Sequence, residues 1–123
     1  MTCHRQYDTV AFDVRDSALM LFFARTSAAG EIDDYLLLMR GDGERIGRAV
    51  YLEINEQQLA GHDLVREARL GENMLTLKLH GPEPALDGAD EIVLSYAASA
   101  SNKASVEAGA FRVLGECLEG GHA

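Results

Sequence analysis

Tyr51-Leu52-Glu53-Ile54-Asn55-Glu56-Gln57-Gln58 is the stretch on which the predicted fold depends. Its first residues alternate between apolar and polar types, and successive side chains of a β-strand point to opposite faces. Leu52 and Ile54 therefore face a core. We predict an interior strand whose other face is open and free to recognise a partner. That face carries a row of polar side chains, from Tyr51, Glu53, Asn55 and Gln57.

Similar patterns recur along most of the chain and predict further strands. Some segments alternate between apolar and polar residues, and others are short apolar runs bounded by turn residues. A hairpin across Asp42-Gly43 joins the third predicted strand to the fourth, and Pro82 ends the sixth because proline cannot donate to a ladder. Residues 57–61 are predicted to be a turn. The seven predicted strands are residues 9–15, 18–25, 34–40, 48–55, 63–70, 74–80 and 91–96.

The period changes near the C-terminus. Apolar residues recur there at spacings of three and four, which indicates one amphipathic helix. Asn102 is its predicted N-cap, and Gly120-Gly121 is its predicted stop. We therefore predict an α+β fold over residues 1–123 as a single domain: a mostly antiparallel, meandering sheet of about seven strands with one C-terminal helix packed on it. The residues of the helical stripe are Val106, Ala110, Val113, Leu114 and Cys117.

Composition narrows the classes of function. The chain has 123 residues, 47% of them hydrophobic and 25% charged, which argues against disorder. Its formal net charge of −9 repels phosphate backbones, so we expect no binding to nucleic acid. Such a charge serves solubility in many proteins. It also steers a chain towards a basic partner.

The termini and the apolar runs bear on location. The first eight residues contain no apolar signal region, and the longest apolar run, residues 18–24, is too short to span a membrane. We therefore expect a cytoplasmic protein that does not bind membranes, with Cys3 and Cys117 as reduced thiols.

Residues with reactive or metal-binding side chains form no recognisable motif. No serine lies in a strained turn, no glycine-rich loop joins a strand to a helix, and the pairs Asp33-Asp34 and Glu53 with Glu56 are ordinary surface carboxylates unless they converge in a cleft. We expect no catalysis, no metal and no cofactor. The Cys and His residues that could meet at the two ends match no standard ligand spacing: Cys3, His4, Cys117 and His122.

Two neighbouring motifs carry a resemblance to a known family. Tyr35-Leu36-Leu37-Leu38-Met39-Arg40 and Tyr51-Leu52-Glu53-Ile54-Asn55-Glu56-Gln57 are followed by a leucine-alternating hairpin, a late strand and a helix. This order resembles immunity protein family ten of bacterial polymorphic toxin systems. The resemblance implies a small cytosolic protein that binds and neutralises a cognate toxin domain without catalysis.

The open strand face has two interpretations. Tyr51, Glu53 and Asn55 are either the solvated side of an antiparallel strand or an aromatic and polar patch that binds a basic toxin domain together with Gln57, Asp33 and Asp34. The resemblance favours the second. The alternatives are a small ligand-binding or enzymatic α+β domain that uses Asp33, Asp34 and Glu53, and a homo-oligomeric structural module, such as a homodimer, that buries this face against a copy of itself.

Overall fold

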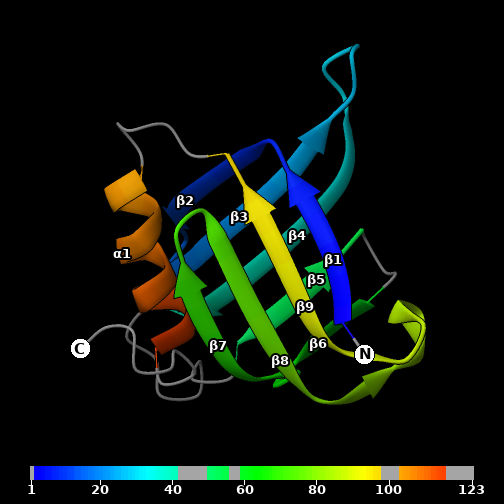
Figure 1. The fold of residues 1–123 in the computed structure, drawn as a ribbon. Coiled ribbons are helices and arrows are strands. Elements are labelled where there is room, and N and C mark those ends of the chain that lie inside the picture. Colours follow the sequence, from blue (N-terminus) through cyan, green and yellow to red (C-terminus); the bar gives the residue numbers. More distant parts are fainter. Residues whose placement is uncertain (1, 42–49, 56–58, 98–102, 116–123) are drawn as a thin grey trace.

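Two β-sheets pack face to face in the computed structural model, which describes residues 2–41, 50–55, 59–97 and 103–115 (Figure 1). One sheet has four strands, in the order β1 (Thr2–Tyr7), β9 (Ala89–Tyr96), β8 (Met74–Glu83) and β7 (Val65–Gly71). The other has five, in the order β2 (Thr9–Arg15), β3 (Ala18–Thr26), β4 (Ile32–Gly41), β5 (Tyr51–Ile54) and β6 (Leu59–His62). The helix α1 (Lys103–Leu114) follows β9.

The α+β class and the antiparallel character are confirmed, but the prediction of one seven-stranded sheet is wrong. Within the described residues the chain forms nine strands in two sheets, and all pairs except the parallel β1–β9 pair are antiparallel. The chain passes between the sheets at two short corners, at Asp8 between β1 and β2 and at Asp63-Leu64 between β6 and β7. Asp63 has a φ of 58°, a left-handed conformation that Asp tolerates better than most residues.

The core lies between the two sheets, where alternation sends large apolar side chains inward. Leu21 and Phe23 of β3 and Leu36 and Leu38 of β4 have no exposed surface. They face a second fully buried set on the four-stranded sheet, which includes Leu75, Leu77, Ile92 and Leu94. Each such side chain stabilises the fold by about 1.5–3 kcal/mol when it leaves water.

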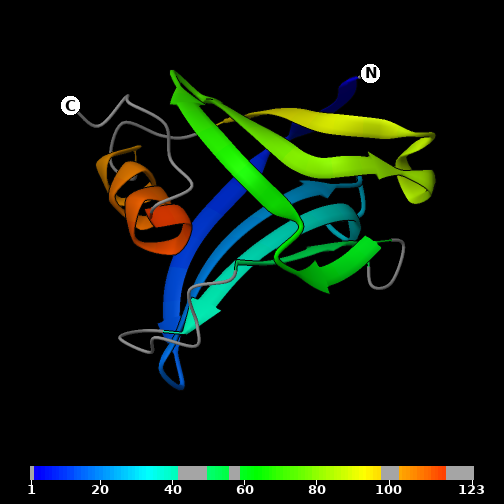
Figure 2. The same cartoon turned by 90° about the horizontal axis from the view of Figure 1, so that it is seen from below.

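The helix α1 closes one side of the core. It lies beside β2 and β7 at the opening between the sheets, and it also packs against β3 and β4 (Figures 1 and 2). Gly109 lets it approach β2 closely, because a Cβ at this position would lie 2.5 Å from the ring of Phe12. The predicted stripe is confirmed where it is described, with Val106, Ala110, Val113 and Leu114 buried.

The described part of the helix stops short of the predicted end. The described helix ends at Leu114, and Gly115 follows with a φ of 47°, the left-handed conformation in which glycine commonly ends a helix. The predicted N-cap Asn102, the stop at Gly120-Gly121 and Cys117 lie outside the described residues.

Three strand assignments also differ from the prediction. The strand β1 was not predicted, and β6 forms where a turn was expected. The strand β8 continues past Pro82 to Glu83, because the register shifts between Lys78 and Glu83 and an irregularity of this kind tolerates proline. The predicted hairpin of β4 with β5 is confirmed as an antiparallel pair, although Asp42-Gly43 itself lies outside the described residues.

Candidate functional site

The outer face of the five-stranded sheet carries large apolar and aromatic side chains. Their strands alternate, so residues next to the core leucines point the other way. One cross-strand row runs Ala11, Phe22, Leu37, Glu53 and Ala60, and the next runs Asp13, Met20, Met39, Tyr51 and His62. We call the partly exposed members of the three central strands the outer patch: Met20, Phe22, Tyr35, Leu37, Met39, Tyr51 and Glu53.

No described strand or helix covers this patch. The four-stranded sheet and α1 both lie on the inner side of the five-stranded sheet, and Figure 2 shows the two layers edge on. In Figure 1 the five-stranded sheet lies behind the four-stranded sheet, so its outer face is turned away from the viewer. A contiguous apolar patch that stays uncovered commonly marks a binding surface.

Glu53 is the centre of a polar cluster within the patch. The hydroxyl of Tyr51 donates a hydrogen bond to Glu53 Oε1 at 2.6 Å, and the hydroxyl of Tyr35 donates to Oε2. The hydrogen bond to Glu53, partial desolvation and the carboxylate charge together raise the pKa of the Tyr51 phenol. Tyr51 is therefore held as a neutral donor, and Tyr35 donates to the other oxygen of the same carboxylate.

Aromatic rings flank this cluster on both sides. The Tyr35 ring stacks on Phe22 with their centroids 5.6 Å apart, and the Tyr51 ring lies 5.1 Å from that of His62. Leu37 is the direct cross-strand neighbour of Glu53. The carboxylate thus sits on an apolar and aromatic surface, with no lysine or arginine of the described segments within ion-pair distance.

Asn55, which was predicted to contact a partner, has a local structural role. Its backbone N–H donates to the Tyr35 carbonyl at 3.2 Å, and its side-chain oxygen accepts from the Tyr35 N–H at 2.8 Å. Its φ of 46° turns the chain out of β5. Asn55 therefore extends the pairing of β4 with β5 beyond the regular ladder.

Asp34 lies on the opposite side of β4 from the outer patch. It is 9% exposed, and both of its carboxylate oxygens accept from Arg5 Nη2, at 2.9 and 3.0 Å. Arg25 Nη2 lies 3.5 Å from Asp34 Oδ2, and the Tyr7 hydroxyl lies 3.4 Å from Oδ1. The pair ties β1 of one sheet to β4 of the other, so Asp34 is a structural residue.

Burial and the interactions within this network together set the protonation of its members. Burial alone would lower the pKa of the Arg5 guanidinium, but its bonds to Asp34 and Tyr7 outweigh that effect and raise the pKa. Burial raises the pKa of the Tyr7 phenol to about 12, although the neighbouring Arg5 charge opposes the shift. Arg5 is therefore charged and Tyr7 neutral at physiological pH.

Asp33 does not join the Glu53 cluster by any hydrogen bond of the described chain. Asp33 is half exposed and pairs with Arg25 at 3.1 Å. It lines a shallow hollow with Ile32, Asp34, Tyr35 and Asn55, at the end of β4. Gln57 lies outside the described residues. The structure thus brings Tyr51 and Glu53 together and adds Tyr35, which begins the first family-like motif but was not predicted as a site residue.

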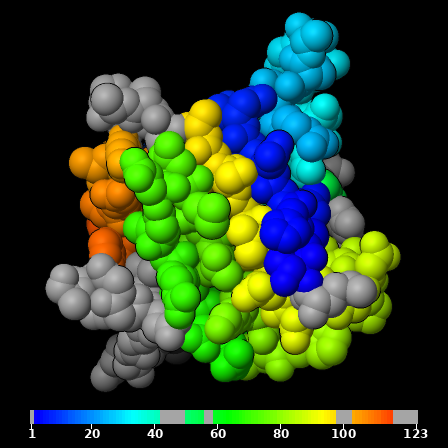
Figure 3. Space-filling model, in the orientation of Figure 1, coloured from blue at the N-terminus to red at the C-terminus, as the bar shows by residue number. Residues whose placement is uncertain are grey.

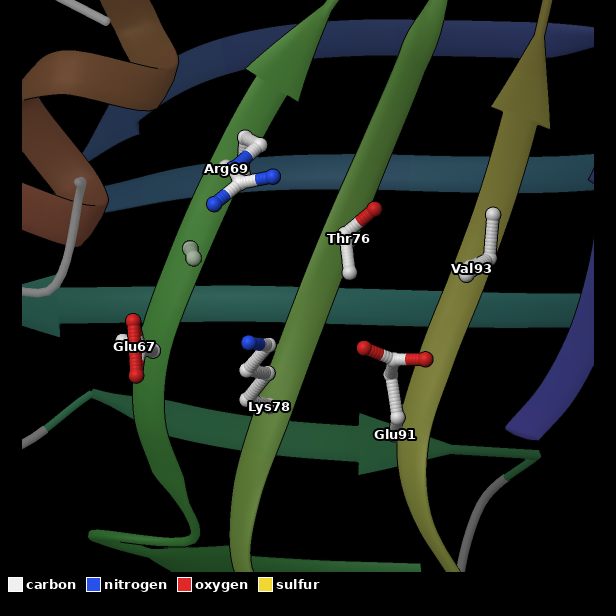
Figure 4. A pocket seen from close by; sticks show the side chains of 7 residues that line it. Glu67, Arg69, Thr76, Lys78, Glu91 and Val93 are labelled. Carbon is white, nitrogen blue, oxygen red and sulfur yellow. The ribbon is translucent and has the colours of Figure 1, made fainter. Parts of the chain in front are cut away.

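The other outer face, on the four-stranded sheet, has a different character. Figure 3 shows it as a continuous surface of β1, β9, β8 and β7. A hollow on this face has a volume of about 220 Å³, and Figure 4 shows the side chains that line it. Lys78 stands between Glu67 and Glu91 in the strand register. The side chains of this hollow carry balanced charges, as expected of a solvated sheet face: Glu67, Arg69, Thr76, Lys78, Glu91 and Val93.

Two further features bear on the class of protein. Among the described helices, none combines the length and apolarity needed to cross a membrane. In the same part of the chain, no three His, Cys, Asp or Glu side chains group closely enough to hold a metal ion. Cys117 and His122, which were considered as ligands, lie outside that part.

In comparisons with known proteins, no family model and no curated protein matches this chain.

Proposed function

We propose that this protein is an immunity protein that binds a cognate toxin domain through the outer patch. The observation that carries the proposal is an uncovered surface on three central strands that combines aromatic, methionine and leucine side chains with one carboxylate. Aromatic residues and methionine are enriched in the buried centres of protein interfaces. The resemblance of residues 35–40 and 51–57 to the immunity family supplies the class of partner.

The charge of the chain supports a basic partner. The formal net charge is −9, and opposite potentials raise the rate of association. Within the patch, Glu53 is hydrogen-bonded only by neutral hydroxyls of the described chain, so its negative charge is available to a cation. Stoichiometric occlusion of the toxin surface then accounts for neutralisation, and no catalytic step is needed.

Co-expression tests this proposal. A toxin domain taken from a gene next to that of this protein is expressed from an inducible promoter, with and without the protein. Growth should be restored by the protein and not by an unrelated domain of similar acidity, because recognition needs the patch as well as the charge. Continued killing in cells that contain more immunity protein than toxin would overturn the proposal.

Self-association is the second candidate, and the apolar character of the outer patch favours it. In a two-fold dimer the outer patches of the two subunits face each other. This brings together two chains that each have a formal net charge of −9, which costs electrostatic free energy. Sedimentation at several protein concentrations separates the candidates. A mass that doubles with concentration supports the dimer.

A further inference from the structure

We infer that Glu53, Tyr35 and Tyr51 form a receptor for a guanidinium group, which the partner presents as an arginine side chain. The inference rests on the proposed function, because it names the chemical group that the outer patch binds. It does not depend on which toxin carries that group.

The hydrogen bonds of Glu53 suit a forked donor. Each carboxylate oxygen accepts one tyrosine hydroxyl, Oε1 from Tyr51 and Oε2 from Tyr35. A carboxylate offers about four lone-pair sites, so each oxygen retains one that no described residue fills. A guanidinium presents parallel N–H groups that can reach both oxygens at once, whereas an ammonium acts as a point charge.

The tyrosines also hold the carboxylate in place. Two hydroxyl donors from neighbouring strands restrict the rotation of the Glu53 side chain before any partner arrives. Binding then costs less conformational entropy than it would at a freely rotating glutamate. The hydroxyls are neutral, so they position the charge without cancelling it.

The surroundings of the carboxylate suit arginine more than lysine. The planar guanidinium stacks on aromatic rings, and rings of Tyr35 with Phe22 and of Tyr51 with His62 flank the site. Leu37, directly across from Glu53, can pack against the methylene stem of the incoming side chain. The same carboxylate on a purely polar face would offer only charge.

The test uses the isolated protein and two small probes. N-acetyl-arginine amide and N-acetyl-lysine amide are titrated into the labelled protein, and chemical shifts are followed by NMR. The arginine probe should bind with a dissociation constant of the order of millimolar, shift signals of Leu37, Tyr51 and Glu53, and bind several-fold tighter than the lysine probe.

Two substitutions make the test specific. Glu53→Gln keeps the shape of the side chain but removes its charge. It should raise the dissociation constant of the arginine probe about tenfold. Glu72→Gln removes the same charge at an exposed turn and should leave the binding unchanged. Equal affinity for both probes, or undiminished arginine binding by Glu53→Gln, would refute the inference that this cluster binds a guanidinium group.

The titration is independent of the toxin. Arginine binding without protection of cells would refute the immunity function and leave the receptor in place. Protection of cells without arginine binding at Glu53 would refute the receptor alone.

Discussion

Replacing Asp34 by alanine should lower the free energy of unfolding by about 3 kcal/mol, because it leaves a guanidinium without its partner between the two sheets. Arg5 and Asp34 have side chains only 13% and 12% exposed, so water compensates little for the lost pair. In a domain of this size, the melting temperature should fall by roughly 10–15 °C, as measured by thermal and denaturant unfolding.

The neighbouring carboxylate provides the matched control. Asp33 also pairs with an arginine, but its side chain is 50% exposed, so Asp33→Ala should cost less than about 1 kcal/mol. The double variant Arg5→Met with Asp34→Leu should recover much of the loss, because apolar groups replace both charges. Equal effects of the two alanine variants would contradict the structural role of Asp34.

Replacing Glu53 by lysine should weaken toxin binding by about 2–5 kcal/mol, which corresponds to a factor of roughly 30 to several thousand in the dissociation constant. The substitution places a positive charge where we propose that a partner's arginine binds. The fold should be kept, since the two tyrosines that lose their acceptor are partly exposed residues whose hydroxyls can bond to water, at a cost of about 1 kcal/mol. Calorimetric titration measures the affinity, and thermal melting checks the fold.

The control Glu72→Lys distinguishes the local effect at Glu53 from the effect of the changed net charge. It changes the net charge by the same amount, but Glu72 lies in the exposed turn between β7 and β8. It should mainly slow association at low salt and change the affinity little. If both lysine variants weaken binding equally, the general charge and not Glu53 accounts for recognition.

Hydrophobic periodicity was sufficient for much of the five-stranded sheet. It assigned Leu52 and Ile54 to the core and Tyr51 and Glu53 to one outer face, and the structure confirms both placements. The helical stripe was equally readable, because Val106 and Val113 recur at helical spacing. Such patterns are local, so one sequence is enough to detect them.

The division into two sheets was not readable from the chain. Single short corners, at Asp8 and at Asp63-Leu64, move the chain from one sheet to the other, and nothing in their residue types distinguishes them from hairpin turns. The strand β1 escaped prediction because one of its inward residues, Arg5, is charged. That arginine is stable inside only because Asp34 pairs with it, and the two are 29 residues apart in the sequence.

The candidate site was readable in part for the same reason. Tyr51 and Glu53 share one strand, so their common face follows from alternation alone. Tyr35 lies on a different strand and reaches Glu53 only through the register in which β4 pairs with β5. Alternation within one strand does not determine that register. Asp34 was grouped with the surface carboxylates because its inward direction becomes significant only once Arg5 is known to face it.

Binding of a partner to the outer face of the five-stranded sheet can be observed by methyl NMR of the labelled protein, with and without the toxin domain. We expect large shifts for Met20, Leu37 and Met39, which lie in the outer patch, and none for Val93 and Met74 on the four-stranded sheet. Shifts confined to Val93 and Met74 would place the partner on the opposite face and contradict the proposal.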